Sequence, residues 1–135
     1  MALIIGVVLA LAVGVFATRI RLDRDRAFYP TIMLVIAVLY VLFAAMGGSR
    51  RALLLDLLVG SVFIVAAVVG FKRSLWIVVA ALAGHGLMDL VHGRFIDNPG
   101  VPVWWPGFCS AYDVCAAAYL AWLLKSGRVR VQGVA

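Results

Sequence analysis

The chain has 135 residues, of which 66% are hydrophobic, well above the roughly 45–50% of an average soluble domain. A mean hydropathy of +1.12 excludes a soluble globular domain and indicates an integral membrane protein. The net charge of +6 does not indicate nucleic-acid binding, because the twelve basic residues lie in short clusters between apolar runs. We therefore expect membrane lipid, and no nucleic acid, as a partner.

Five apolar runs follow one another along the sequence, and each is close to the roughly 20 residues that a helix needs to cross a bilayer. None shows the polar and apolar alternation of a barrel strand. The connections between the runs are short, so consecutive helices should be antiparallel. We predict an all-α polytopic membrane protein with five transmembrane helices, forming a single domain over residues 1–135, with spans at residues 2–18, 28–46, 52–71, 75–96 and 105–124.

The first run, "MALIIGVVLALAVGVFA", has no basic residues before its apolar stretch. The basic residues follow it instead, in "TRIRLDRDR". A cleaved signal peptide has the opposite order. We therefore expect this run to be a retained membrane span rather than a removed targeting segment.

The basic residues also predict the orientation of the chain. Three basic residues would lie at the end of the bundle where the first span begins, namely Arg50, Arg51 and Arg94. Nine would lie at the opposite end, namely Arg19, Arg21, Arg24, Arg26, Lys72, Arg73, Lys125, Arg128 and Arg130. By the positive-inside rule, we predict a multi-pass protein of the cell membrane with its amino terminus outside and its carboxyl terminus cytoplasmic.

The fourth run contains the stretch "GHGLMDLVHG", which places two histidines and an aspartate in a predicted membrane span. At about 100° per residue, His85, Asp89 and His92 lie within roughly 60° of one another on a helix. Ionisable side chains at membrane depth are costly and tend to be functional. This helix face is therefore the first candidate for a site.

Two further carboxylates lie in neighbouring spans. Asp56 and Asp113 should share a depth with Asp89, roughly 8–10 Å below the outer surface by the helical rise per residue. An ionised carboxylate that faces lipid costs on the order of 3 kcal/mol, so all three should turn inward and meet the histidines in one outward-opening pocket. Three more residues could complete this pocket, namely Cys109, Tyr112 and Arg94.

Imidazole and carboxylate groups together are typical ligands of zinc and other divalent metals. We expect His85, Asp89 and Asp113 to be the ligands, while His92 and Asp56 are candidates for proton transfer or for orienting the ligands. A metal with an open coordination position can activate water. The leading hypothesis is a membrane hydrolase that acts on a lipid or another amphiphile.

Other interpretations of the same residues remain open. His85 lies between two glycines and could be an axial ligand of haem or a related pigment. The polar set could instead belong to a small proton- or cation-coupled transporter, with a path continuing through Tyr40 and Thr31. The protein could also be an accessory subunit of a larger membrane complex, in which the polar groups only bond one another. Small residues in the first span, Gly6, Ala10 and Gly14, would pack the bundle or a homo-oligomer.

The stretches "AGHGLMDLVHGRFIDNPGVPVWWPGFCSAYDVCAAAYLAW" and "RDRAFYPT" carry a resemblance that covers nearly the whole chain. They resemble a family of small multi-span membrane proteins of unknown function, with a G-H-x3-D-x2-H motif, a Pro/Trp-rich loop and a W-x-P-x-F-C-x3-D pattern. The resemblance implies a membrane protein, but no particular activity. It points to His85, Asp89, His92, Trp105, Cys109 and Asp113 as site residues.

The predicted orientation can be tested with reporters fused after Ala135. An enzyme reporter that is active only outside the cytoplasm should remain inactive there, because the basic end of the bundle stays inside. A reporter that is active only in the cytoplasm, fused at the same position, should be active and serves as the control. The reverse pattern of activities would mean that the pocket opens toward the cytoplasm.

Overall fold

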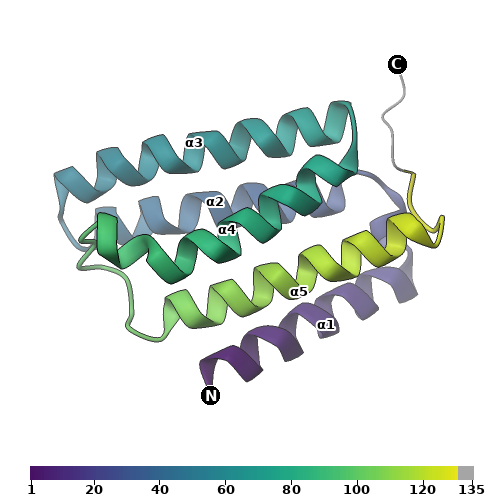
Figure 1. Cartoon of the computed structure of the whole chain (residues 1–135), viewed down its shortest axis with the longest axis horizontal. Helices are drawn as coiled ribbons and strands as arrows, with labels where there is room; N and C mark the ends of the chain where they lie inside the picture. The colour runs from purple at the N-terminus through teal and green to yellow at the C-terminus, as the bar shows by residue number, and fades with distance from the viewer. Residues whose placement is uncertain (131–135) are drawn as a thin grey trace.

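The computed structural model describes residues 1–130, which form five long helices and one short 3-10 helix (Figure 1). The helices are α1 (Ala2–Ile20), η1 (Leu22–Arg24), α2 (Phe28–Met46), α3 (Arg50–Lys72), α4 (Leu75–Phe95) and α5 (Trp105–Lys125). All five α-helices are long and apolar enough to cross a membrane. The predicted all-α polytopic fold is confirmed, and each helix ends within two residues of its predicted span.

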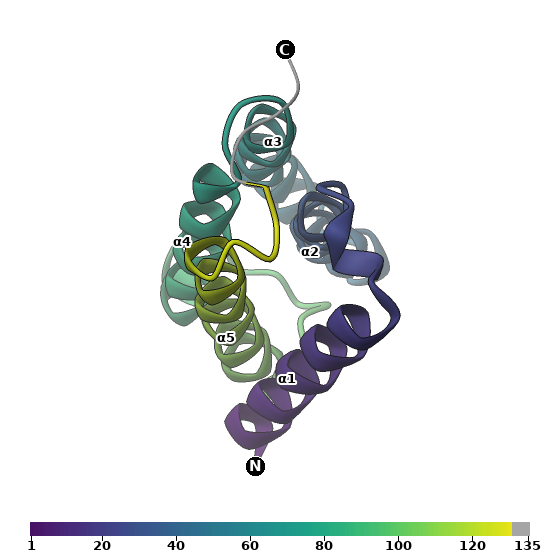
Figure 2. The ribbon, with the colours of Figure 1, turned by 90° about the vertical axis from the view of Figure 1, so that its right-hand side faces the viewer.

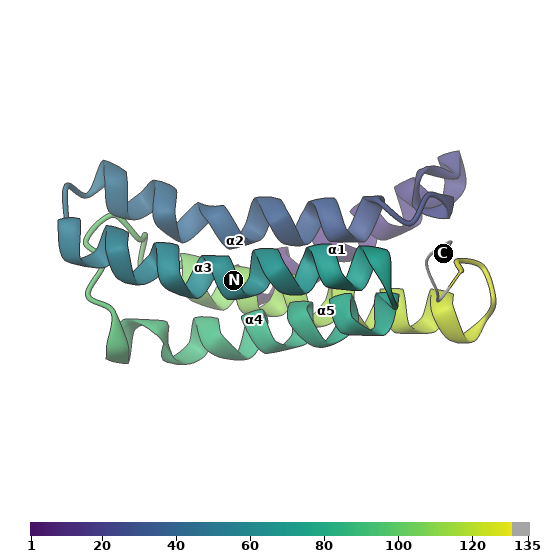
Figure 3. The ribbon, with the colours of Figure 1, turned by 90° about the horizontal axis from the view of Figure 1, so that it is seen from above.

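The helices run side by side along the long axis of the molecule, with consecutive helices antiparallel (Figures 1 and 3). Seen along that axis, they follow one another around a ring in the order α1, α5, α4, α3, α2 (Figure 2). The neighbours in this series pack on each other, but its two end members, α1 and α2, make almost no direct contact. They are joined through η1, so the ring is open between them.

Helix ends are fixed by polar groups that satisfy the free backbone atoms. Ser49 and Ser74 cap α3 and α4 by accepting hydrogen bonds from the backbone N–H groups of Ala52 (3.2 Å) and Trp76 (3.4 Å). At the other end of α3, the Arg26 guanidinium donates to the carbonyl oxygens of Gly70 and Phe71. These contacts hold the short connections in place.

The small residues of α1 pack against α5 within the chain. A Cβ atom on Gly14 would lie 2.9 Å from the ring of Tyr119, and one on Gly6 would overlap the carbonyl oxygen of Phe108. Ala10 is buried on the same face. Of the two predicted roles, bundle packing is therefore the one that this face performs.

Gly86 lies at a close contact between α4 and α5, near the polar residues. A Cβ atom there would lie 3.0 Å from the Ser110 carbonyl oxygen and 3.2 Å from the Asp113 Cβ atom. Gly84 differs, because the nearest atom to a Cβ there is a ring carbon of Phe63 at 4.0 Å. The absence of a side chain at Gly86 therefore sets the distance between the two helices.

This difference gives a matched pair of variants. Gly86→Ala should destabilise the protein by about 1–3 kcal/mol, because a methyl group would force α5 away from α4. Gly84→Ala should leave stability unchanged or raise it slightly, because alanine is the better helix former. Thermal unfolding of both variants in the same detergent measures the effect, and equal melting temperatures would show that the α4–α5 contact is not tight at Gly86.

Candidate metal centre

Four potential metal-binding side chains meet between α4 and α5. His85 and Asp89 are one helical turn apart on α4, and Cys109 and Asp113 are one turn apart on α5, so each pair shares a helix face. One ligand atom from each residue lies within 4.8 Å of all the others. All four side chains belong to buried residues, and Asp113 has an exposed fraction of 0%. Asp89 and Asp113 thus meet His85 inside the bundle, as their shared depth predicts.

The imidazole of His85 lies between the two carboxylates. Its Nδ1 atom is 2.8 Å from Oδ2 of Asp113 and 3.6 Å from Oδ2 of Asp89. A proton on Nδ1 would be donated to Asp113 at the shorter distance. The Cys109 thiol also donates to Oδ2 of Asp113, at 3.8 Å. Oδ2 of Asp113 therefore takes part in both hydrogen bonds of this cluster.

Several buried oxygen atoms in this cluster have no hydrogen-bond partner among residues 1–130. They are both carboxylate oxygens of Asp89 and Oδ1 of Asp113, and the hydroxyl of nearby Tyr40 also has no hydrogen-bond partner. Burying an ionised carboxylate without a partner is very costly, so such groups normally hold a proton, a cation or a metal ion. The two carboxylates carry two negative charges, whereas His85 can supply at most one positive charge. The cluster therefore has both the negative charge and the free carboxylate oxygens that a bound cation requires.

Asp56 and His92 form a second cluster with different chemistry. His92 Nε2 lies 2.7 Å from Oδ1 of Asp56, and the Asn98 amide donates to Oδ2 of Asp56 at 2.8 Å. Asn98 also donates to the Tyr40 carbonyl oxygen and accepts from the Gly100 N–H. Both carboxylate oxygens of Asp56 are therefore satisfied. The single pocket expected from the sequence is in fact two neighbouring clusters, one saturated with hydrogen bonds and one not.

Tyr40 separates these two clusters. Its ring stacks on that of His92, with centroids 4.0 Å apart, and lies 6.1 Å from the ring of His85. Phe63 contacts His85 edge to face at 4.8 Å. These rings fill the space beside His85 in α2 and α3, where no void large enough for a water molecule remains. On this side of His85, a haem macrocycle would have space only if these rings moved, and the haem interpretation stays a prediction.

Two other expectations need correction. Arg94 is exposed and lines a polar depression of about 250 Å³ with Arg51 at the ends of α3 and α4, so it does not reach the carboxylates. Arg94 lies instead beside residues at the start of α3. Thr31 was a possible step in a transport path, but its hydroxyl donates to the Ala27 carbonyl oxygen. It therefore does not extend the polar cluster of Tyr40 and His85.

Sequence reasoning missed Asn98 as a partner of the polar residues. It lies in the loop between α4 and α5, outside every apolar run, so no helical periodicity linked it to Asp56. The only signal was the turn-forming stretch "DNPG". The loop folds back over the ends of α2 and α3 and places Asn98 inside.

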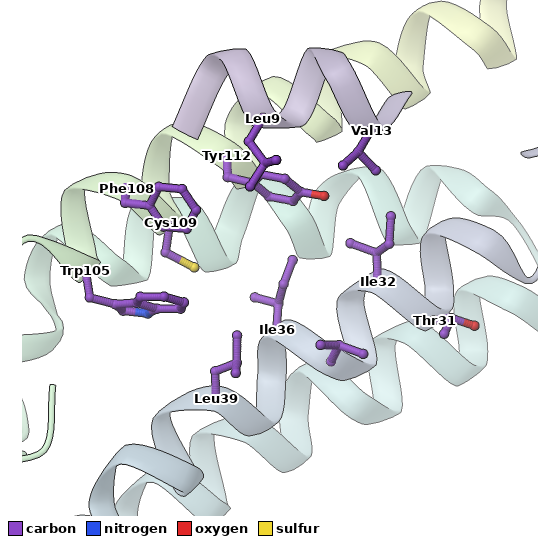
Figure 4. A pocket seen from close by; sticks show the side chains of 11 residues that line it. Leu9, Val13, Thr31, Ile32, Ile36, Leu39, Trp105, Phe108, Cys109 and Tyr112 are labelled. Atoms are coloured by element: carbon purple, nitrogen blue, oxygen red, sulfur yellow. The ribbon is translucent and has the colours of Figure 1, made fainter. Parts of the chain in front are cut away.

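An apolar groove of about 420 Å³ lies beside the four-residue cluster, between α1, α2 and α5 (Figure 4). Cys109 belongs to both the groove and the cluster, and its sulfur points into the groove. Tyr112, expected in the polar pocket, lines this groove instead. The other residues of the groove wall are Leu9, Val13, Thr31, Ile32, Val35, Ile36, Leu39, Trp105 and Phe108.

No family model, curated protein or solved structure matches this chain. Its function is therefore inferred from the chemistry of the site. Two features matter most. They are the buried carboxylate oxygens without hydrogen-bond partners and the neighbouring groove, which shares Cys109 with their cluster.

The saturated cluster should support stability rather than metal binding. Asn98→Ala removes two donated hydrogen bonds and leaves Oδ2 of Asp56 without its partner, which should cost about 1–3 kcal/mol. Asp97→Ala, at the exposed neighbouring position, is the control and should have almost no effect. Melting temperatures measured by circular dichroism test this, and equal values for the two variants would show that the network contributes nothing to folding.

Proposed function

We propose that the protein binds one divalent metal ion through His85, Asp89 and Asp113, and that zinc fits best. One imidazole nitrogen and two carboxylate oxygens are ligands that zinc accepts at about 2.0–2.2 Å. The ligand atoms already lie within 4.8 Å of one another, so side-chain movements on the order of 1 Å would bring them around one ion. The observation that carries the proposal is the set of buried carboxylate oxygens without hydrogen-bond partners.

Charge balance favours a divalent cation over a shared proton. Two ionised carboxylates and a doubly charged ion sum to zero when His85 is neutral, and a neutral imidazole is the form that binds metal. A single proton on His85 would leave one of the two negative charges uncompensated in a buried site. The mixed nitrogen and oxygen ligand set also suits zinc better than calcium or magnesium, which prefer oxygen alone.

The fourth side of the site faces Cys109 and the groove. If three residues hold the metal, this side can take a water molecule, as in catalytic zinc sites. Zinc lowers the pKa of bound water to about 7 and so supplies hydroxide at neutral pH. Ester or amide hydrolysis then adds water across the acyl bond and gives an acid with an alcohol or amine, with no oxidant or reductant. A carboxylate oxygen of Asp89 could accept the proton that the water loses.

The surroundings support a membrane hydrolase that acts on a lipid or another amphiphile. The site is buried inside a bundle whose outer surface is apolar, and the adjoining groove is apolar as well. Water-soluble substrates would have to cross this surface, whereas an amphiphile already lies beside it. With the amino terminus outside, as the charge distribution predicts, the site would serve the outer half of the membrane.

Metal analysis of the purified protein tests the proposal. Protein prepared without chelator should contain about one zinc ion per chain by mass-spectrometric elemental analysis. His85→Ala and Asp113→Asn should each lower metal affinity by at least about tenfold, because each removes a ligand. Asp56→Asn is the matched control, since it changes a buried aspartate that lies in the saturated cluster, and it should keep its metal.

Cys109→Ala separates an open site from a closed one. With three protein ligands and water, this variant should keep most of its metal. A loss as large as that of His85→Ala would identify the thiol as a fourth ligand and a structural site without catalysis. Wild-type protein that takes up none of the divalent metals offered in excess would contradict the proposal and leave the carboxylates as proton-sharing groups.

A further inference from the structure

The apolar groove is open sideways, toward the place where lipid would lie. The opening lies between α1 and α2, which make almost no direct contact with each other (Figure 2). Leu9 on α1 and Val35 on α2 line the groove and are also 43% and 54% exposed on the outside of the bundle. In a bilayer, these positions face lipid chains. A chain can therefore enter the groove from the membrane without crossing water.

One end of the groove carries polar groups that suit a carbonyl compound. The Trp105 indole N–H is buried and has no hydrogen-bond partner in the described part of the chain. Cys109 lies one turn further along α5, and its sulfur is 3.8 Å from Oδ2 of Asp113. Buried donors of this kind fix the orientation of ligands in otherwise apolar sites. Beyond them, the walls are formed by aliphatic side chains of α1 and α2, together with Thr31 of α2 and the aromatic Phe108 and Tyr112 of α5.

The size of the groove indicates how much of an amphiphile it can hold. Its volume of about 420 Å³ lies within the roughly 300–1,000 Å³ of small-molecule sites. At about 30 Å³ per group, the volume of a water molecule in the liquid, it holds roughly 14 such groups. That is the scale of one lipid chain and well short of two.

We propose that the groove holds one acyl chain of an ester- or amide-linked membrane lipid, with the carbonyl group at the Trp105 and Cys109 end. The chain then runs between α1 and α2 toward Val13 and Thr31. The indole N–H, which is buried in the wall of the empty groove, would turn to donate to the carbonyl oxygen. Cys109 would lie between the acyl carbon and the carboxylates of the metal centre. This assignment rests on the proposed function, because it makes the groove the substrate site of the same hydrolase.

A photoreactive lipid tests this placement. The probe is phosphatidylcholine with a diazirine in the middle of one acyl chain, mixed into nanodiscs that contain the full-length protein. Labelled residues, located by mass spectrometry, should concentrate on the α2 wall of the groove at Ile32 and Ile36, which are less exposed than the outer faces of the helices. Uniform labelling of all lipid-facing helices would overturn the proposal, because the groove would then hold no preferred chain.

A matched pair of tryptophan variants makes the test specific. Val35→Trp places a large side chain in the groove and should lower groove labelling at least fivefold, whereas Val62→Trp on α3 lies outside the groove and should leave it unchanged. Melting temperatures of both variants confirm that they fold. Equal groove labelling in the two folded variants would also overturn the proposal.

Metal content, measured on the same preparations, keeps the two proposals distinguishable. Val35 is not among the metal ligands, so Val35→Trp should bind as much zinc as the wild type. Zinc without groove labelling would contradict the lipid assignment alone. Groove labelling in a protein that binds no metal would contradict the proposed function, and with it the role of the groove as a substrate site.

Discussion

The close approach of α4 and α5 at Gly86 is the constraint on which the site depends. Each helix carries its polar residues one turn apart, so each presents a short polar strip rather than a pocket. The two strips become one four-residue cluster only because Gly86 lets Ser110 and Asp113 of α5 come against the α4 backbone. A wider spacing would separate the carboxylates and leave each facing an apolar neighbour.

The two polar clusters show how a buried network can serve either structure or chemistry. Asp56 has a partner for each carboxylate oxygen, and Asn98 uses both its amide hydrogens and its carbonyl oxygen. Such a network is stable as it stands, and adding a cation would break bonds already made. Asp89 has no hydrogen-bond partner among the described residues, although it is equally buried. The difference in saturation, rather than in residue type, distinguishes the candidate site.

Hydropathy alone predicted the five helices, because a segment that crosses a bilayer must be long and apolar, and each long apolar run of this sequence forms one helix. The depth argument also brought Asp89 and Asp113 together, since residues at equal depth on adjacent inward faces must meet. It did not separate Asp56 from them. The depth of a residue gives its level in the membrane, but not the direction in which its helix points the side chain. On α3, Asp56 points toward His92 and the Asn98 loop. Arg94 was misplaced for the same reason, and Asn98 had no periodic signal at all.

In the lipid proposal, the open side of the helix ring is the route from the membrane toward the buried site. Around the ring, every neighbouring pair of helices packs together except α1 and α2. The small residues of α1 contact α5 rather than α2. The remaining gap falls beside Cys109, the residue that connects the groove with the carboxylates. If the groove holds a lipid chain as proposed, that chain would come up to Cys109 through the gap between α1 and α2. The carboxylates behind Cys109 would stay shielded from bulk water, where electrostatic interactions are strong.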